Sequence, residues 1–134
     1  MTRIVLALFI VAHGLIHASY VMPRPAPTPG GPAWPFELAR SWFLSPLGVS
    51  ESLLRPLGIG LAVLAVIAFA LAGLATLGVI LPVSAWQPLV ATGAVASLAL
   101  LVLFFHPWIV LGVAIDVALV VAIWQADWSP DALT

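Results

Sequence analysis

The sequence contains no cysteine and no lysine, and its charged residues are four arginines and five acidic residues in 134 positions. Without cysteine the chain can form no disulfide, no thiolate metal ligand and no thiol-based redox relay, although this says nothing about its compartment. Without a basic cluster it has no site for the phosphates of a nucleic acid. Charged residues make up 7% of the chain, whereas soluble proteins contain about a quarter.

The sequence is correspondingly rich in hydrophobic residues. They make up 63% of the sequence, and the mean hydropathy is +1.22. A soluble domain of this size could not cover so much apolar side chain with so little polar surface. The composition therefore excludes a soluble enzyme, a nucleic-acid-binding protein and a disordered tail. It predicts a single integral membrane domain over residues 1–134, with the lipid bilayer as its first partner.

Four apolar stretches, at about residues 4–22, 57–81, 89–105 and 108–124, have lengths close to the roughly 20 residues that a helix needs to cross a bilayer. Only helices satisfy their own backbone groups in lipid, so we expect an all-α, four-helix transmembrane bundle. No small-residue cleavage site follows the first stretch, so we expect it to be a retained helix and not a signal peptide. Small residues spaced four apart predict close helix packing: Ala68, Ala72 and Thr76, and then Gly93 and Ser97.

The first loop, residues 23–52, contains six prolines between residues 23 and 35, which predict an extended start. Residues 35–44 have the pattern of a short amphipathic helix lying at the membrane interface, with Pro35 in its first turn. Glu37 and Arg40 lie three residues apart on that helix. They either pair with each other or cover the mouth of a pocket in the bundle.

An aspartate and two histidines lie within the predicted spans, where residues that can carry a charge near neutral pH are costly. Asp116 is nine residues inside the fourth span, and His13 is nine residues inside the first, counted from the same side. At 1.5 Å per residue, both are about 13 Å below the surface that carries the first loop. A hydrogen bond or ion pair between His13 and Asp116 would stabilise both, and Gly112 would allow the two helices to approach each other. His17 projects from the same side of its helix as His13.

These residues support several interpretations. The pair of His13 and Asp116 could act only as structural glue between the first and last helices. Alternatively His13, His17 and Asp116 form a ligand or proton site, with Tyr20 near its mouth. The same three side chains are also competent ligands for a metal ion such as zinc or iron, or they could hold a quinone head group. Glu37, Arg40 and His106 are further candidates for the pocket mouth, although His106 also fits a simple interfacial position.

Three functions are consistent with this pattern, and none of them specifies a reaction. The first is an accessory subunit or small-ligand binder with a polar intramembrane pocket. The second is a metal- or quinone-dependent membrane redox enzyme subunit, and the third is a small proton-coupled transporter. Either another membrane subunit or a second copy of the chain would then be a partner.

The first span carries Arg3, then an apolar run, then His13 and Gly14, with His17 three residues further on. This motif resembles that of the DoxX-like family of small four-helix bacterial membrane proteins, in which a lysine often stands at the position of His17. The pair Ile115-Asp116 in the fourth span is also similar. The resemblance implies a four-helix subunit of the bacterial cytoplasmic membrane, often accompanying redox or quinone-linked systems. The long proline-rich loop 23–52 departs from the family pattern.

Overall fold

The computed structural model describes residues 1–27, 29–125 and 130. Its elements are, in chain order, α1 (Thr2–Ile16), η1 (His17–Tyr20), η2 (Ser45–Leu47), α2 (Glu51–Leu77), η3 (Val83–Ala85), α3 (Trp86–Leu103), η4 (Pro107–Ile109) and α4 (Val110–Gln125), where η denotes a 3₁₀ helix. Four helical segments are long and apolar enough to cross a membrane: Thr2–Tyr20, Glu51–Leu77, Val83–Leu103 and Pro107–Trp124. The predicted all-α four-helix architecture is confirmed.

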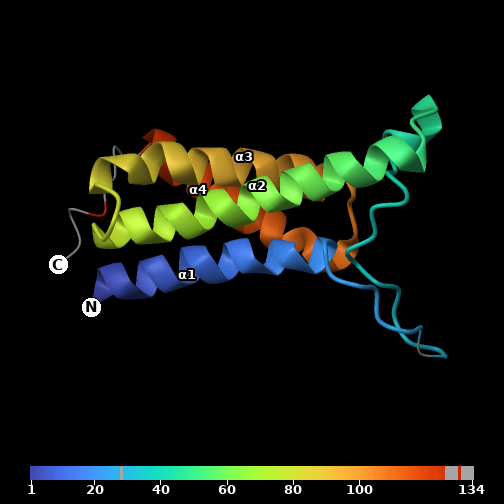
Figure 1. The fold of residues 1–134 in the computed structure, drawn as a ribbon, viewed down its shortest axis with the longest axis horizontal. Coiled ribbons are helices and arrows are strands. Elements are labelled where there is room, and N and C mark those ends of the chain that lie inside the picture. The colour runs from blue at the N-terminus through green and yellow to red at the C-terminus, as the bar shows by residue number, and fades with distance from the viewer. Residues whose placement is uncertain (28, 126–129, 131–134) are drawn as a thin grey trace.

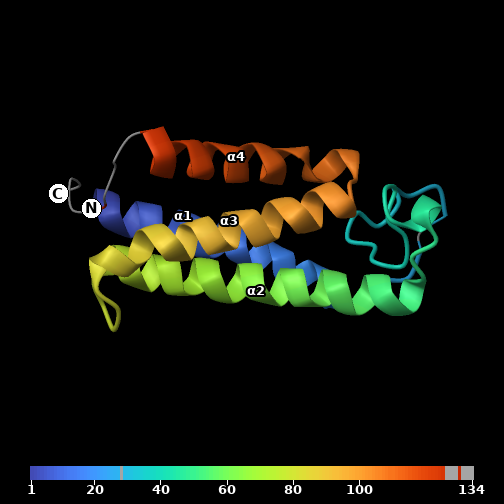
Figure 2. The same cartoon turned by 90° about the horizontal axis from the view of Figure 1, so that it is seen from above.

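The long helices run up and down as a bundle in which each packs on its neighbour in sequence (Figures 1 and 2). The N-terminus lies at the same end as the last turn of α4, and the first loop lies at the other end (Figure 1). Most of α4 lines the outside of the bundle, because Asp116 and Ile123 are its only buried residues among those described. Asp116 is therefore the main polar attachment of this helix.

Helix α2 differs in its bounds from the predicted span of residues 57–81. It begins at Glu51, with Ser50 in the extended conformation before it, so Pro56 lies inside the helix. It ends at Leu77 because Gly78 takes up a left-handed conformation (φ +66°) that reverses the chain. The first span also differs from a simple α-helix, since it tightens to a 3₁₀ turn at His17.

Close contact between α1 and α2 depends on glycines. A Cβ atom added at Gly73 would lie 2.4 Å from a methyl group of Val11 and 3.2 Å from the carbonyl oxygen of Ala7. One added at Gly14 would lie 2.6 Å from Cβ of Phe69. The absence of side chains at these two positions lets the helix backbones approach each other, as in many membrane helix pairs.

The predicted interfacial helix over residues 35–44 is not formed. This stretch is irregular, and the loop instead has the short 3₁₀ helix Ser45–Leu47 directly after it. Side chains provide the hydrogen bonds that a helix would have made: a carboxylate oxygen of Glu37 accepts from the backbone N–H of Ala39 (2.8 Å), and the Ser41 hydroxyl accepts from that of Leu44 (3.1 Å).

Two hydrogen bonds hold this irregular loop on the end of α3. The Ser41 hydroxyl donates to the carbonyl oxygen of Leu103, and the Trp42 indole N–H donates to that of Val102, both at 2.6 Å. These carbonyls belong to the last turn of a helix, where no intrahelical partner is available. The loop therefore covers the end of the bundle that is nearest to the polar residues of the spans.

Candidate functional site

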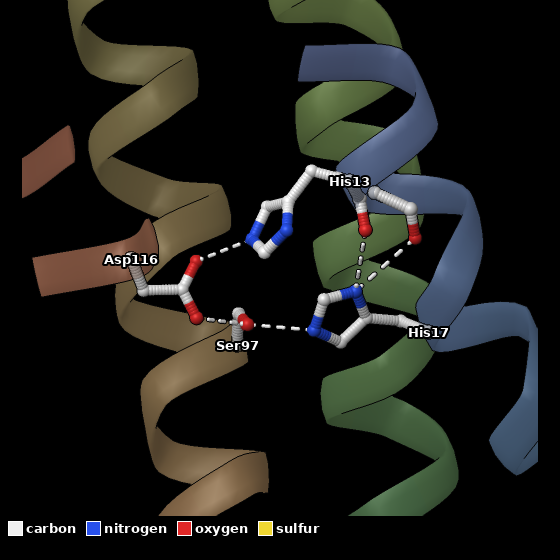
Figure 3. A network of polar contacts seen from close by, with 5 residues as sticks. His13, His17, Ser97 and Asp116 are labelled. Atoms are coloured by element: carbon white, nitrogen blue, oxygen red, sulfur yellow. Dashed lines mark hydrogen bonds and ion pairs between the residues drawn. The ribbon is translucent and has the colours of Figure 1, made fainter. Parts of the chain in front are cut away.

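The polar residues of the spans meet in one hydrogen-bonded group, which we call the polar cluster: His13 of α1, His17 at the start of η1, Ser97 of α3 and Asp116 of α4 (Figure 3). Nε2 of His13 lies 2.8 Å from one carboxyl oxygen of Asp116. The other carboxyl oxygen contacts the Ser97 hydroxyl, which lies 2.6 Å from Nε2 of His17. The predicted approach of His13 to Asp116 is thus observed, and it extends into a chain of four side chains.

The polar cluster is closed off from its surroundings. His13 and His17 are 3% and 2% exposed, and Ser97 and Asp116 are fully buried. On the side of α2, the phenyl ring of Phe69 lies against both imidazoles, with ring centroids 5.0 Å from His13 and 6.3 Å from His17. In so apolar a setting a polar atom without a hydrogen-bond partner is strongly destabilising. Each side chain of the cluster therefore depends on its neighbours for its position.

The ring of His17 is oriented by its own helix. Its Nδ1 atom lies 3.2 Å from the carbonyl oxygens of both His13 and Gly14 (Figure 3). Where α1 tightens into the 3₁₀ turn, the backbone N–H of His17 donates to the carbonyl of Gly14, which leaves that of His13 available. The contact of Nδ1 fixes the ring so that Nε2 points at Ser97. The turn at His17 is therefore what brings the second imidazole into the cluster.

A cavity of about 160 Å³ adjoins the polar cluster on the side of the first loop. His13, His17 and Tyr20 of the first span form one wall, and Gly112 and Ile115 of α4 lie in another. Further lining residues are apolar or aromatic: Ile16, Phe36, Leu101, Trp108, Ile109 and Leu111. Ile16, Trp108 and Leu111 are largely exposed on the outside of the bundle. The rim of the cavity therefore includes residues of the outer, apolar side of the bundle.

The hydroxyl of Tyr20 is buried beside this cavity without a hydrogen-bond partner among the described residues. Tyr20 is 6% exposed, and its ring packs edge-on against Phe36 with centroids 5.1 Å apart. A buried hydroxyl without a partner loses about 1–3 kcal/mol relative to one that has found its bond. This unsatisfied group distinguishes the cavity from a simple packing defect.

The predicted mouth residues lie elsewhere, because none of the three lines the cavity. Glu37 pairs with Arg24 (3.0 Å), so the predicted pair of Glu37 with Arg40 is not formed. His106 accepts a hydrogen bond at Nδ1 from the backbone N–H of Trp108 (3.2 Å), which caps the turn η4. Phe36 and Trp108 occupy the place that the sequence pattern suggested for Glu37, Arg40 and His106.

The residues predicted as metal ligands do not fit a metal ion. Among the residues that the structure describes, no group of three histidine, aspartate or glutamate side chains is arranged to hold one. Nε2 of His13 is hydrogen-bonded to Asp116. Both ring nitrogens of His17 are in hydrogen bonds, one to Ser97 and the other to backbone carbonyls. The nitrogen and oxygen atoms that could ligate a metal ion therefore hydrogen-bond within the cluster and do not converge on a common point.

Ser97 is the member of the cluster that sequence reasoning missed. The sequence pattern places it in a small-residue packing stripe with Gly93, and both residues are buried on α3. The third and fourth spans form an antiparallel pair, and Ser97 lies on the third at nearly the depth of Asp116 on the fourth. This similarity in depth was the signal that the sequence offered for their contact. The hydroxyl joins the two imidazoles into one network.

Comparison of the chain with protein-family models, with curated proteins and with solved structures finds no match.

Proposed function

We propose that this chain is a small integral membrane protein whose cavity, next to the polar cluster, binds a small ring-shaped ligand that carries a hydrogen-bonding oxygen. Phenols and quinone head groups share this chemistry. The observation that carries the proposal is the buried hydroxyl of Tyr20, which has no hydrogen-bond partner among the described residues and belongs to a side chain that lines the cavity. An oxygen atom on the ligand would complete its hydrogen bond.

The size of the cavity supports a ligand of one ring. A cavity of about 150 Å³ in a protein core is large enough to admit benzene, and this one measures about 160 Å³. Its walls offer aromatic faces from Tyr20, Phe36 and Trp108, against which a flat ring packs favourably. A rim on the outer, apolar side of the bundle suits a molecule dissolved in the bilayer, since a substituent on the ring could extend into the lipid.

The proposal also covers the family and the cellular location of the protein. The motif of Arg3, His13 and Gly14 supports membership of the DoxX-like family and residence in the bacterial cytoplasmic membrane. In that setting the chain acts as an accessory subunit beside another membrane protein or a second copy of itself. A wholly structural role for His13 and Asp116 is the competing function, and it predicts no ligand binding.

A single-site spectroscopic titration tests the proposal, because Tyr20 is the only tyrosine of the chain. Protein labelled with ¹³C at the tyrosine Cζ would be placed in lipid nanodiscs and titrated with phenol, with benzene as the matched probe lacking oxygen. We expect phenol to shift the Tyr20 resonance saturably by hydrogen bonding to the hydroxyl. Benzene should give a smaller, ring-current shift.

Two variants locate the binding site. Ile115→Trp adds side-chain volume to the cavity wall and should abolish the shift with phenol. Val117→Trp puts the same side chain two residues further along α4, at a position 48% exposed and outside the cavity, and should leave the titration unchanged. The proposal fails if phenol gives no saturable shift, or if the Ile115→Trp variant titrates like the wild type.

A further inference from the structure

The hydrogen bonds of the polar cluster do not balance with its side chains in their ordinary forms. Three contacts each need a hydrogen: His13 to Asp116, Asp116 to Ser97, and Ser97 to His17. The Nδ1 atom of His17 needs another, because its neighbours there are carbonyl oxygens, which only accept. The cluster therefore needs four hydrogens in defined places.

With both imidazoles neutral and Asp116 ionised, the side chains supply only three. A neutral His13 provides one hydrogen for Asp116, and Ser97 provides one for either of its neighbours. The single hydrogen of a neutral His17 is used at Nδ1. One contact of Ser97 would then join two lone pairs, which is repulsive and costly in a buried site.

We infer that the polar cluster holds one additional proton, shared between Asp116 and His17 through the hydroxyl of Ser97. In one arrangement the proton is on the carboxyl group of Asp116, which donates to Ser97, and Ser97 donates to a neutral His17. In the other, Asp116 is ionised and accepts from Ser97, which accepts from a His17 imidazolium. The two arrangements interconvert when Asp116 gives a proton to the Ser97 oxygen and Ser97 gives its own to Nε2 of His17.

An additional proton on His13 does not solve the deficit, because it would occupy Nδ1, on the side of the ring away from Asp116 (Figure 3). Charge favours the same conclusion. With the ordinary forms the buried cluster has a net charge of −1, and the proton makes it neutral in the apolar interior. The described residues of α2 beside it are uncharged: the ring of Phe69 and, next to His17, the apolar side chains of Ala62 and Val66. Tyr20 lies beyond His17 in the cavity wall.

The same geometry makes the polar cluster a store for a proton and not a channel. The chain of hydrogen bonds ends at Nδ1 of His17, where two backbone carbonyls accept and cannot pass a proton on. The opposite end is the ring of His13, which lines the cavity. Exchange with an occupant of the cavity would therefore proceed through His13. The bound proton itself needs no ligand, so this inference stands independently of the proposed function.

Magnetic resonance can count the protons directly. Protein labelled with ¹⁵N-histidine and with ¹³Cγ-aspartate would be studied in bilayers at neutral pH, with His106 as an internal reference outside the cluster. We expect either a protonated carboxyl signal from Asp116 or an imidazolium signal from His17, or an exchange average of the two. Neutral signals from both His13 and His17 together with an ionised Asp116 would overturn the inference.

The variant Asp116→Asn is the matched control. Its amide carbonyl can accept from His13 and its N–H can donate to Ser97, so all four hydrogens are supplied with both imidazoles neutral. We expect its Tm to stay within about 3 °C of the wild type, whereas that of Asp116→Ala should fall well below it. If Asp116→Asn loses as much as Asp116→Ala, the negative charge itself holds the site together and the proton is not bound.

Discussion

Helix α1 meets its two neighbours in different ways. Against α2 it packs through glycines, with Gly73 facing the apolar side chain of Val11 and Gly14 facing that of Phe69. Toward α4 it makes the hydrogen bond between His13 and Asp116, with a cavity beside it. The first interface depends on shape along several turns, and the second depends on a few polar atoms at one depth.

This difference follows from the bilayer as a solvent. Lipid tails are as apolar as leucine, so apolar helix faces gain stability in a membrane only by packing more closely than lipid can. A polar group in the same setting has few alternative partners, so it selects one neighbour. The contact between α1 and α2 therefore supplies stability, while the polar cluster holds α4 in position beside a cavity.

The largest effect is expected from Asp116→Ala, which would break the polar interface. The change leaves the ring N–H of His13 and one contact of Ser97 without a partner, at about 3 kcal/mol in total. Unfolding in mixed detergent and SDS, followed by circular dichroism, measures the loss. Val117→Ala, at the exposed neighbouring position, is the control and should cost less than about 0.5 kcal/mol. Equal losses in the two variants would contradict the account.

Gly73→Val would break the apolar interface instead. Its Cβ would overlap a methyl group of Val11, whose side chain has little rotational freedom, so α1 and α2 must separate; the cost is about 2 kcal/mol. At the exposed Gly60 an added Cβ meets no atom within 4 Å, so the same substitution there should change stability by about 0.5 kcal/mol or less. If both variants unfold at the same SDS fraction as the wild type, glycine packing does not hold these helices.

The smallest effect is expected at the exposed pair of Arg24 and Glu37, which sharpens the contrast with the buried cluster. Glu37→Gln removes the charge but keeps an acceptor for the backbone N–H of Ala39. Because both partners are substantially exposed, we expect a change below about 1 kcal/mol. The same unfolding assay at low and high salt checks this prediction, and a larger, salt-independent loss would show that the loop conformation depends on the pair.

The four spans were predictable because each apolar run is close to the length of a membrane-crossing helix. The contact of His13 with Asp116 was predictable as well, because two antiparallel helices place residues at equal depth opposite each other. Depth is a one-dimensional quantity that the sequence records directly. It needs no knowledge of how the helices rotate about their axes.

The predicted helix over residues 35–44 was wrong for a reason that the sequence conceals. An apolar periodicity is shared by an interfacial helix and by an irregular loop that buries the same residues. Here Leu38 packs against Gly58, and Ser41 bonds to the end of α3, so tertiary contacts override the local pattern. The cavity was equally hidden, since Phe36 and Trp108 come from segments far apart in the chain.

A double-mutant cycle between His13→Ala and Asp116→Ala most directly tests whether one polar contact joins the first helix to the last. Unfolding free energies of the wild type, both single variants and the double variant would be measured in the same detergent mixture. The account predicts a coupling energy of about 1 kcal/mol, because the second change removes an interaction that the first has already lost. Effects that add within about 0.3 kcal/mol would contradict it.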